Sequence, residues 1–279
     1  MACPTVQELL RSGDDLPGDS ARRDSEILLG HCLSKPRSWL YTWPEREVPA
    51  SQADHFKQLL DERRRGQPVA YLVGRREFWS LSLEVNRHTL IPRPETETLV
   101  SWALELALPA NARVLDLGTG SGAIALALAS ERPQWQVLGV DASQEALAVA
   151  RGNAAQLQLG RVSFARSDWY SAVASQRFHL LAANPPYIDP LDSPLHCGDV
   201  RFEPRSALVA SRAGMADLAA LVDGAPLQLH PGGWLLLEHG FDQGEAVRGL
   251  LQRAGFVDVT TRCDLAGQER ITGASIRVE

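Results

Sequence analysis

Residues 113–129 read RVLDLGTGSGAIALALA, and this stretch decides the fold class. The apolar run Arg113–Leu117 predicts a strand, the glycines after it predict a tight turn, and Ala123–Ala129 is typical of a helix. A strand, a turn and a helix in this order form the first half of a βαβ unit. The stretch therefore predicts a parallel sheet covered by helices.

The same alternation continues to the end of the chain. We expect further strands at residues 137–140, 162–165, 178–183, 234–238, 256–261 and 274–278, and helices at 143–158, 213–229 and 243–254. Strands separated by helices pair in parallel, whereas the loop before the last strand is too short for a crossover. The predicted fold class is α/β, with a mostly parallel sheet and an antiparallel last strand.

The chain divides into three predicted parts. Residues 1–75 carry short helical patterns, starting at a capping box made by Thr5 and Glu8, and should form a helical bundle. Residues 76–90 alternate apolar and polar side chains around Leu81, which predicts a linker hairpin. Residues 91–279 make up the α/β domain.

Charge is distributed unevenly over the 279 residues. Residues 1–90 hold 13 basic and 13 acidic side chains, so the net charge of −6 lies in residues 91–279. An acidic α/β domain argues against a protein that binds mainly to nucleic-acid phosphates. The third helix ends at three arginines, Arg63, Arg64 and Arg65. Such a run is typical of a solvated helix terminus, and a partner-binding patch is the alternative.

Cysteine spacing and hydropathy narrow the class of protein further. The cysteines form no CxxC pair, so we expect reduced thiols and no metal site; they are Cys3, Cys32, Cys197 and Cys263. The chain begins without a signal-peptide pattern and holds no apolar run of membrane-spanning length. We therefore expect a cytoplasmic protein.

The first candidate ligand loop follows the strand Arg113–Leu117. It consists of Gly118, Thr119, Gly120, Ser121 and Gly122. Glycines let a ligand approach the backbone closely, and the spacing G-x-G-x-G differs from the dinucleotide fingerprint G-x-G-x-x-G. Asp116, just before the loop, suits an ammonium group better than a pyrophosphate. The loop favours S-adenosylmethionine, with a nucleotide phosphate site or an ordinary strand-to-helix turn as alternatives.

Acidic residues follow the next two strands, where ligands of open α/β sheets bind. Asp141 is placed to accept from both hydroxyls of a ribose, and it could equally begin a helix. Asp168 could accept from an adenine amino group, with Trp169 packed on the ring. The alternative for this pair is a turn aspartate beside a core tryptophan.

The fourth loop, Asn184–Tyr187, reads NPPY. Asn184 and the carbonyl of Pro185 offer hydrogen-bond acceptors on a backbone stiffened by Pro185 and Pro186, and Tyr187 adds a flat face. Two acceptors suit a planar –NH2 group that must turn its nitrogen toward a methyl donor. A bare N-P pair usually marks a turn, but here it follows three loops that fit one cofactor.

Together these four loops resemble the class I S-adenosylmethionine-dependent amino-methyltransferases. Three further segments, and the chain as a whole, resemble one family of that class, the release factor glutamine methyltransferases, also called PrmC or HemK. These segments are IPRPETE at 91–97, RFEPRSAL at 201–208 and DLAGQER at 264–270.

The resemblance implies a Rossmann-like class I methyltransferase sheet, preceded by a small N-terminal helical domain and a hairpin linker. It implies methyl transfer from S-adenosylmethionine, leaving S-adenosylhomocysteine, to the glutamine amide nitrogen in the Gly-Gly-Gln motif of class-1 release factors. The cofactor site would be lined by Gly118 to Gly122, Asp141, Trp169 and Asn184. We add Asp168 to it on chemical grounds. Asn184 to Tyr187 would hold the amide, with Asn184 and Pro185 as the catalytic pair.

The role of Ile91–Glu97 stays open, since Pro94, Glu95 and Glu97 are also typical of a helix start. We expect residues 1–75 to dock the release factor, and we expect a monomer without membrane or direct nucleic-acid binding.

Three rival functions remain beside this one. The nearest is methylation of an exocyclic amine on a nucleic-acid base, which requires an exposed base and a basic groove. The G-x-G-x-G spacing and the NPPY loop argue against a Rossmann-type oxidoreductase. The presence of Asn184 and Asp141 argues against a non-catalytic binding module.

Overall fold

The computed structural model describes residues 3–18, 20–192, 195 and 198–277, and it divides into two compact units. The first unit consists of the chain up to Arg75 and the short helix η4 (Asp199–Phe202). The second unit is the remainder of the chain from Arg76 onward. Each unit has its own hydrophobic core.

The first unit is helical, as predicted. Its core gathers Val6, Leu10, Leu28, Phe56 and Leu60, all essentially inaccessible to solvent. The capping box is present: Glu8 N donates to Thr5 Oγ1 and Thr5 N donates to the Glu8 carboxylate. Besides η4, the helices are α1 (Val6–Arg11), α2 (Ala21–Leu33), α3 (Arg37–Thr42), α4 (Ala50–Arg64) and α5 (Val69–Val73).

The arginine run at the end of α4 is paired within this unit. Arg63 is buried: its Nε lies 2.8 Å from Asp24 Oδ2, and its Nη1 lies 2.6 Å from Asp199 Oδ1. Arg64 pairs with Asp15 and Asp61, and Arg65 pairs with Glu62. The prediction of a solvated helix terminus is therefore wrong for Arg63, because two acidic side chains from distant parts of the chain compensate its charge.

Replacing Arg63 with Met should destabilise the helical unit by about 3–5 kcal/mol, because buried Asp24 would lose its partner. Adding Asp24→Leu should recover most of that loss, since no unpaired buried charge would remain. Urea unfolding followed by circular dichroism measures both variants. A double variant as unstable as the single one would show that Asp24 is not the source of the loss.

The second unit opens with a two-stranded hairpin, which confirms the predicted one. Its strands are β1 (Arg75–Phe78) and β2 (Leu81–Glu84). Buried Asn153 exchanges two hydrogen bonds with the backbone of Glu84 and donates a third to Ser121 O. The hairpin is thus tied to the glycine loop through one side chain.

A seven-stranded sheet organises the rest of this unit, in the order β5-β4-β3-β6-β7-β9-β8. The strands from β5 to β7 are parallel, and β9 is antiparallel to both of its neighbours, which confirms the predicted fold class. The strands are β3 (Arg113–Leu117), β4 (Gln136–Asp141), β5 (Ser163–Arg166), β6 (Phe178–Ala183), β7 (Leu229–Glu238), β8 (Val257–Cys263) and β9 (Glu269–Ser275).

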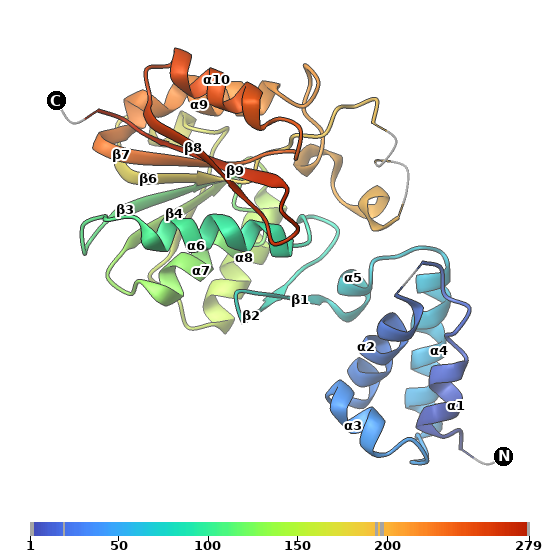
Figure 1. Cartoon of the computed structure of the whole chain (residues 1–279). Coiled ribbons are helices and arrows are strands. Elements are labelled where there is room, and N and C mark those ends of the chain that lie inside the picture. The colour runs from blue at the N-terminus through green and yellow to red at the C-terminus, as the bar shows by residue number, and fades with distance from the viewer. Residues whose placement is uncertain (1–2, 19, 193–194, 196–197, 278–279) are drawn as a thin grey trace. The chain divides into compact units, whose positions relative to one another are not determined.

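Helices cover both faces of the sheet (Figure 1). On β3, Val114 belongs to one core with α6 and α7, whereas Leu115 and Leu117 belong to the other core with α9 and α10. Successive side chains thus point to opposite faces of the sheet, as expected for a strand that is buried on both faces. The α-helices are α6 (Glu97–Glu105), α7 (Ala123–Glu131), α8 (Gln144–Gln156), α9 (Ala216–Gln228) and α10 (Gly244–Arg253), and the 3-10 turns are η1 (Pro94–Thr96), η2 (Ser171–Val173) and η5 (Arg205–Ala207).

Two strands differ from their predicted bounds by more than two residues. β7 starts at Leu229, before the turn-like residues 230–233, and its pairing with β6 shifts in register there. β9 starts at Glu269 rather than Ala274, because its polar first residues pair with β8 and β7. Val278, the predicted end of that strand, lies outside the described residues.

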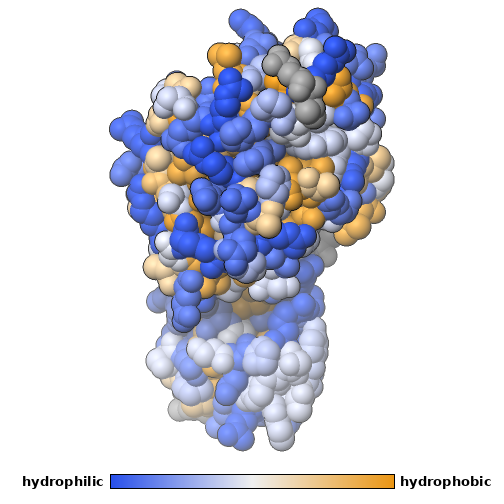
Figure 2. Space-filling view, turned by 90° about the vertical axis from the view of Figure 1, so that its left-hand side faces the viewer, coloured by the Kyte–Doolittle hydropathy of each residue, from blue (hydrophilic) through white to orange (hydrophobic). Residues whose placement is uncertain are grey.

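On the face drawn in Figure 2, hydrophobic residues form separate small groups among hydrophilic ones. None of the helices in the described part of the chain is both long and apolar enough to cross a membrane. Cys3, Cys32 and Cys263 are free thiols, and Cys197 lies outside the described residues.

Candidate active site

The four predicted loops follow β3, β4, β5 and β6 at the carboxyl edge of the sheet. From β3 to β5 the strands are added toward one edge of the sheet, and from β6 onward they are added on the other side of β3. Ligands of such sheets bind at this switch point between β3 and β6. A cavity of about 430 Å³ opens there. Its wall includes nine of the predicted site residues: Gly118, Thr119, Gly120, Ser121, Asp141, Asp168, Trp169, Asn184 and Pro186.

Gly122, Pro185 and Tyr187 are not part of this wall. Gly122 precedes α7 with a φ of +86°, and an added Cβ there would lie 3.0 Å from Leu126 Cδ1. Its conformation therefore requires glycine and shapes the loop from behind. Tyr187 is held by its main-chain oxygen, which accepts from Gln243, and by its hydroxyl, which donates to Glu238.

The expectation that Asp116 faces an ammonium group is wrong. Its side chain is fully buried, and Oδ2 accepts from the Thr119 hydroxyl at 2.6 Å and from Ala125 N at 3.1 Å. Oδ1 has no hydrogen-bond partner within the described residues. Burial raises the pKa of this carboxyl to about 7. Asp116 supports the glycine loop and the start of α7 from beneath.

Asp141 joins two parts of the cavity wall. Its Oδ2 accepts from Gly120 N and its Oδ1 accepts from Ser143 N, both at 2.9 Å. Ser143 itself caps α8 by accepting from Ala146 N. An ionised carboxylate has about four acceptor positions, so each oxygen of Asp141 keeps one for a ligand.

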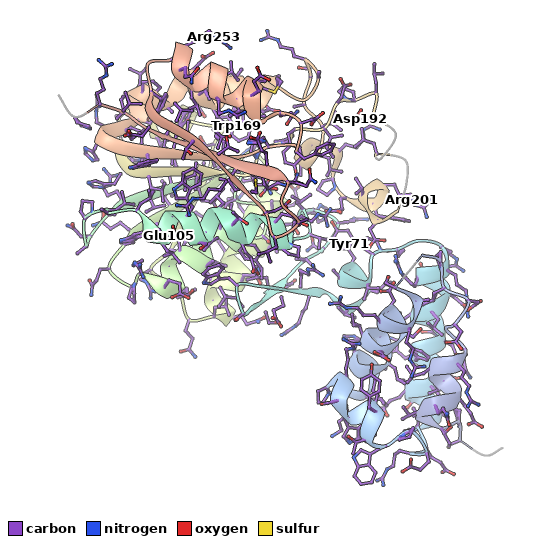
Figure 3. All side chains as sticks on the ribbon, in the orientation of Figure 1. Tyr71, Glu105, Trp169, Asp192, Arg201 and Arg253 are labelled. Atoms are coloured by element: carbon purple, nitrogen blue, oxygen red, sulfur yellow. The ribbon has the colours of Figure 1, made fainter. Side chains whose placement is uncertain are left out.

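Trp169 lies at the first loop, although it comes from the loop after β5 (labelled in Figure 3). An added Cβ on Gly118 would lie 3.5 Å from its ring. Trp169 has a φ of +43°, and Ser167 Oγ donates to its main-chain oxygen at 2.7 Å. Asp217 lines the cavity as well, and burial together with the negative charge of Asp168 raises the pKa of its carboxyl.

Asn184 is anchored from one side. Its Nδ2 donates to Thr96 Oγ1 at 3.2 Å, and the Thr96 hydroxyl donates to Glu238 Oε2 at 2.6 Å. Glu238 ends β7, is 1% exposed, and also accepts at Oε1 from the Tyr187 hydroxyl at 3.3 Å. Asn184 and Tyr187 are therefore connected to the same buried carboxylate.

Two segments to which the sequence assigns no role, 91–97 and 201–208, meet beside the cavity. Glu203 is buried and accepts from Ile91 N at 2.9 Å and from the Arg93 guanidinium. It thereby fastens the 91–97 segment to the 201–208 segment at Glu203. Pro92 and Thr96 from the first segment and Pro204 from the second line the cavity.

Sequence reasoning missed several residues of the cavity wall, among them Arg87, His88, Thr96 and Asp217. Thr96 lies inside the singled-out 91–97 segment, which was a usable signal. Asp217 and the pair Arg87–His88 belong to no motif, and only the folded chain brings them to the cavity.

The cavity fits S-adenosylmethionine in size and in chemistry. Its volume falls within the range of about 300–1,000 Å³ typical of small-molecule sites. Gly118 and Gly120 have φ values of +74° and +55°, and a Cβ on Gly120 would meet no atom within 4 Å, so a ligand can approach this backbone. Asp141 has acceptors to spare for a ribose, and Trp169 provides an aromatic surface.

Comparisons with known proteins identify the two domains and the fold. The PrmC N-terminal domain matches residues 8–74, and the methyltransferase small domain matches residues 96–198. The solved structure of the hMettl16 catalytic domain, in complex with MAT2A 3′UTR hairpin 1, has a TM-score of 0.58 and 17% identity over 83% of both chains. A methyltransferase from Pyrococcus furiosus has a TM-score of 0.54 and 16% identity over 71% of this chain and 90% of its own. The fold and the cavity define a class I S-adenosylmethionine-dependent methyltransferase.

Curated relatives identify the family within that class. The release factor glutamine methyltransferase of Pseudomonas aeruginosa is 53% identical over 268 residues, which cover 96% of this chain and 97% of the relative. That of Shewanella oneidensis is 52% identical over 254 residues, which cover 91% of this chain and 89% of the relative. The chain belongs to the release factor glutamine methyltransferase family.

Proposed function

We propose that this chain methylates the side-chain amide nitrogen of the glutamine in the Gly-Gly-Gln motif of class-1 release factors. Membership of the family supports this reaction and S-adenosylmethionine as the methyl donor. One observation carries the proposal: Asn184 shares a cavity wall with Gly118 and Asp141. An amide held at the 184–187 loop would therefore lie beside the cofactor.

The predicted cofactor-binding residues receive the following roles in this proposal. Asp141 accepts from the ribose hydroxyls, Trp169 packs against the adenine, and Asp168 accepts from the adenine amino group. The backbone and hydroxyl groups of Gly118, Thr119, Gly120 and Ser121 surround the methionine part, and Gly122 sets the shape of their loop. When bound, the cofactor supplies a methyl group on a positively charged sulfur.

Asn184 and Pro185 prepare the substrate nitrogen. An amide nitrogen is a poor nucleophile, because its lone pair is delocalised into the carbonyl. The Asn184 side-chain oxygen and the Pro185 carbonyl would accept its two hydrogens and hold the –NH2 off the amide plane. Such positioning can be worth about 7–11 kcal/mol of a reaction barrier.

The transfer needs no base beforehand. The nitrogen lone pair forms the new N–C bond while the C–S bond breaks, and its electron pair stays on sulfur. The nitrogen then carries positive charge, which the two acceptors stabilise, and loses one proton readily. The loop accordingly holds acceptors and no His or Lys.

We further propose that the helical residues 1–75 dock the release factor and that the enzyme is a cytoplasmic monomer. Release factors act in translation, which favours this location. The net charge of −6 supports a protein substrate over nucleic acid.

Radiolabelled S-adenosylmethionine tests the substrate. We expect label in a class-1 release factor and none in a variant whose Gly-Gly-Gln glutamine is replaced by Ala. Transfer RNA and double-stranded DNA, offered in parallel, should remain unlabelled. Equal label in both release factors, or label in the nucleic acids alone, would contradict the assignment.

A further inference from the structure

The buried carboxylate of Glu238 has no part in the transfer described above. It ends β7, and its two oxygens accept from one hydroxyl each, of Thr96 and of Tyr187. Burial raises the pKa of this carboxyl to about 7, against the lowering effects of the Thr96 hydrogen bond and the charge of Arg270. A carboxylate without a proton can only accept hydrogen bonds, which matches the two donors around it.

The Thr96 hydroxyl carries a single hydrogen, and its direction follows from Glu238. Oγ1 lies 2.6 Å from Oε2, so when Glu238 is ionised the hydrogen points at the carboxylate. Only lone pairs of Oγ1 remain for Asn184, whose Nδ2 lies at 3.2 Å. The Asn184 atom that faces Thr96 must therefore be the donor Nδ2.

This constraint determines what Asn184 presents to the cavity. With Nδ2 turned to Thr96, the other branch of the amide is Oδ1, which makes no hydrogen bond among the described residues. A turn of the side-chain amide by half a rotation would exchange the two groups. The substrate –NH2 would then meet another –NH2, a donor facing a donor.

We propose that Thr96 and Glu238 are positioning residues for methyl transfer: Glu238, acting through the Thr96 hydroxyl, fixes the Asn184 amide so that its oxygen faces the substrate. This inference rests on the proposed function, because it assumes that Asn184 accepts from the glutamine amide. It also gives the 91–97 segment a role, since that segment delivers Thr96 to the site and Glu203 holds it there.

Thr96→Val tests the proposal, because it removes the hydroxyl and keeps the shape of the side chain. We expect kcat for release-factor methylation to fall about tenfold or more. The KM for the release factor and the Kd for S-adenosylhomocysteine should stay within about twofold of wild type, since Val leaves both binding surfaces in place. Thr96→Ser, which restores the hydroxyl, should recover kcat to within about threefold. Ser101→Ala, which removes a hydroxyl from α6 that pairs with Glu105, is the matched control.

A kcat for Thr96→Val equal to wild type would overturn the proposal, as would a Thr96→Ser variant no better than Val. Equal losses in kcat, KM and cofactor Kd would also overturn it, because they would indicate general damage to the site. If Val at this position lowers the melting temperature, Thr96→Ala makes the same comparison. A wild-type enzyme that leaves the glutamine unmethylated would instead defeat the proposed function, so the two failures are distinguishable.

Discussion

Replacing Asn184 with Ala should lower kcat for release-factor methylation about 10²–10³-fold, the scale expected for one lost hydrogen-bonding group placed at the reacting atoms. The substrate nitrogen would lose one of its two acceptors and return to the amide plane. The hydrogen bond to Thr96 is a side-chain contact of Asn184 itself, so its loss leaves the backbone of β6 unchanged. Steady-state kinetics with saturating cofactor measures the effect.

Asn111→Ala is the matched control, because this asparagine is exposed in the loop before β3 and lies outside the cavity wall. The melting temperature of Asn184→Ala should stay near that of wild type. Turnover within twofold of wild type in a folded Asn184→Ala variant would remove this residue from the mechanism.

Asp141→Asn should weaken S-adenosylmethionine binding about 100-fold, because hydrogen bonds to a charged group contribute about 1.5–3 kcal/mol each. The carboxylate holds Gly120 N and Ser143 N while keeping acceptors for the ribose. An asparagine has one oxygen, and its –NH2 would face one of these backbone donors. The substitution would therefore weaken the contact to the ribose and also the hydrogen bonds that hold the loop.

Isothermal titration calorimetry measures this affinity directly. Asp223→Asn is the matched control, because Asp223 is exposed on α9 and is not part of the cavity wall. We expect the loss for Asp141→Asn to appear mainly in cofactor Kd, with a smaller change in kcat at saturation. An unchanged Kd would contradict the ribose assignment.

Much of the fold could be predicted because its central strands are buried on both faces. The runs Arg113–Leu117 and Phe178–Ala183 are apolar and end at turn residues, and the structure has the same bounds. The polar start of β9 at Glu269 was missed, since its pairing with β8 and β7 depends on neighbours rather than on its own composition. Arg63 was misjudged for the same reason: its partners Asp24 and Asp199 are distant in the sequence.

The same distinction, between local sequence pattern and distant packing partners, applies to the site residues. Residues at the end of a strand or directly after it, such as Asp141 and Asn184, could be placed because parallel strands end at one edge of the sheet. Thr96 and Glu238 could not be connected, since 142 residues separate them and only packing brings their oxygens together. Asp116 precedes the glycine loop and looked like a ligand group, but burial beneath the loop makes it a support.

Tandem mass spectrometry of a release factor treated with the enzyme and S-adenosylmethionine tests the central claim most directly. The account predicts one added methyl group, located on the side-chain amide of the Gly-Gly-Gln glutamine, and none after treatment with Asn184→Ala over the same time. A methyl group on another residue, or an unmodified glutamine beside active wild-type enzyme, would contradict it.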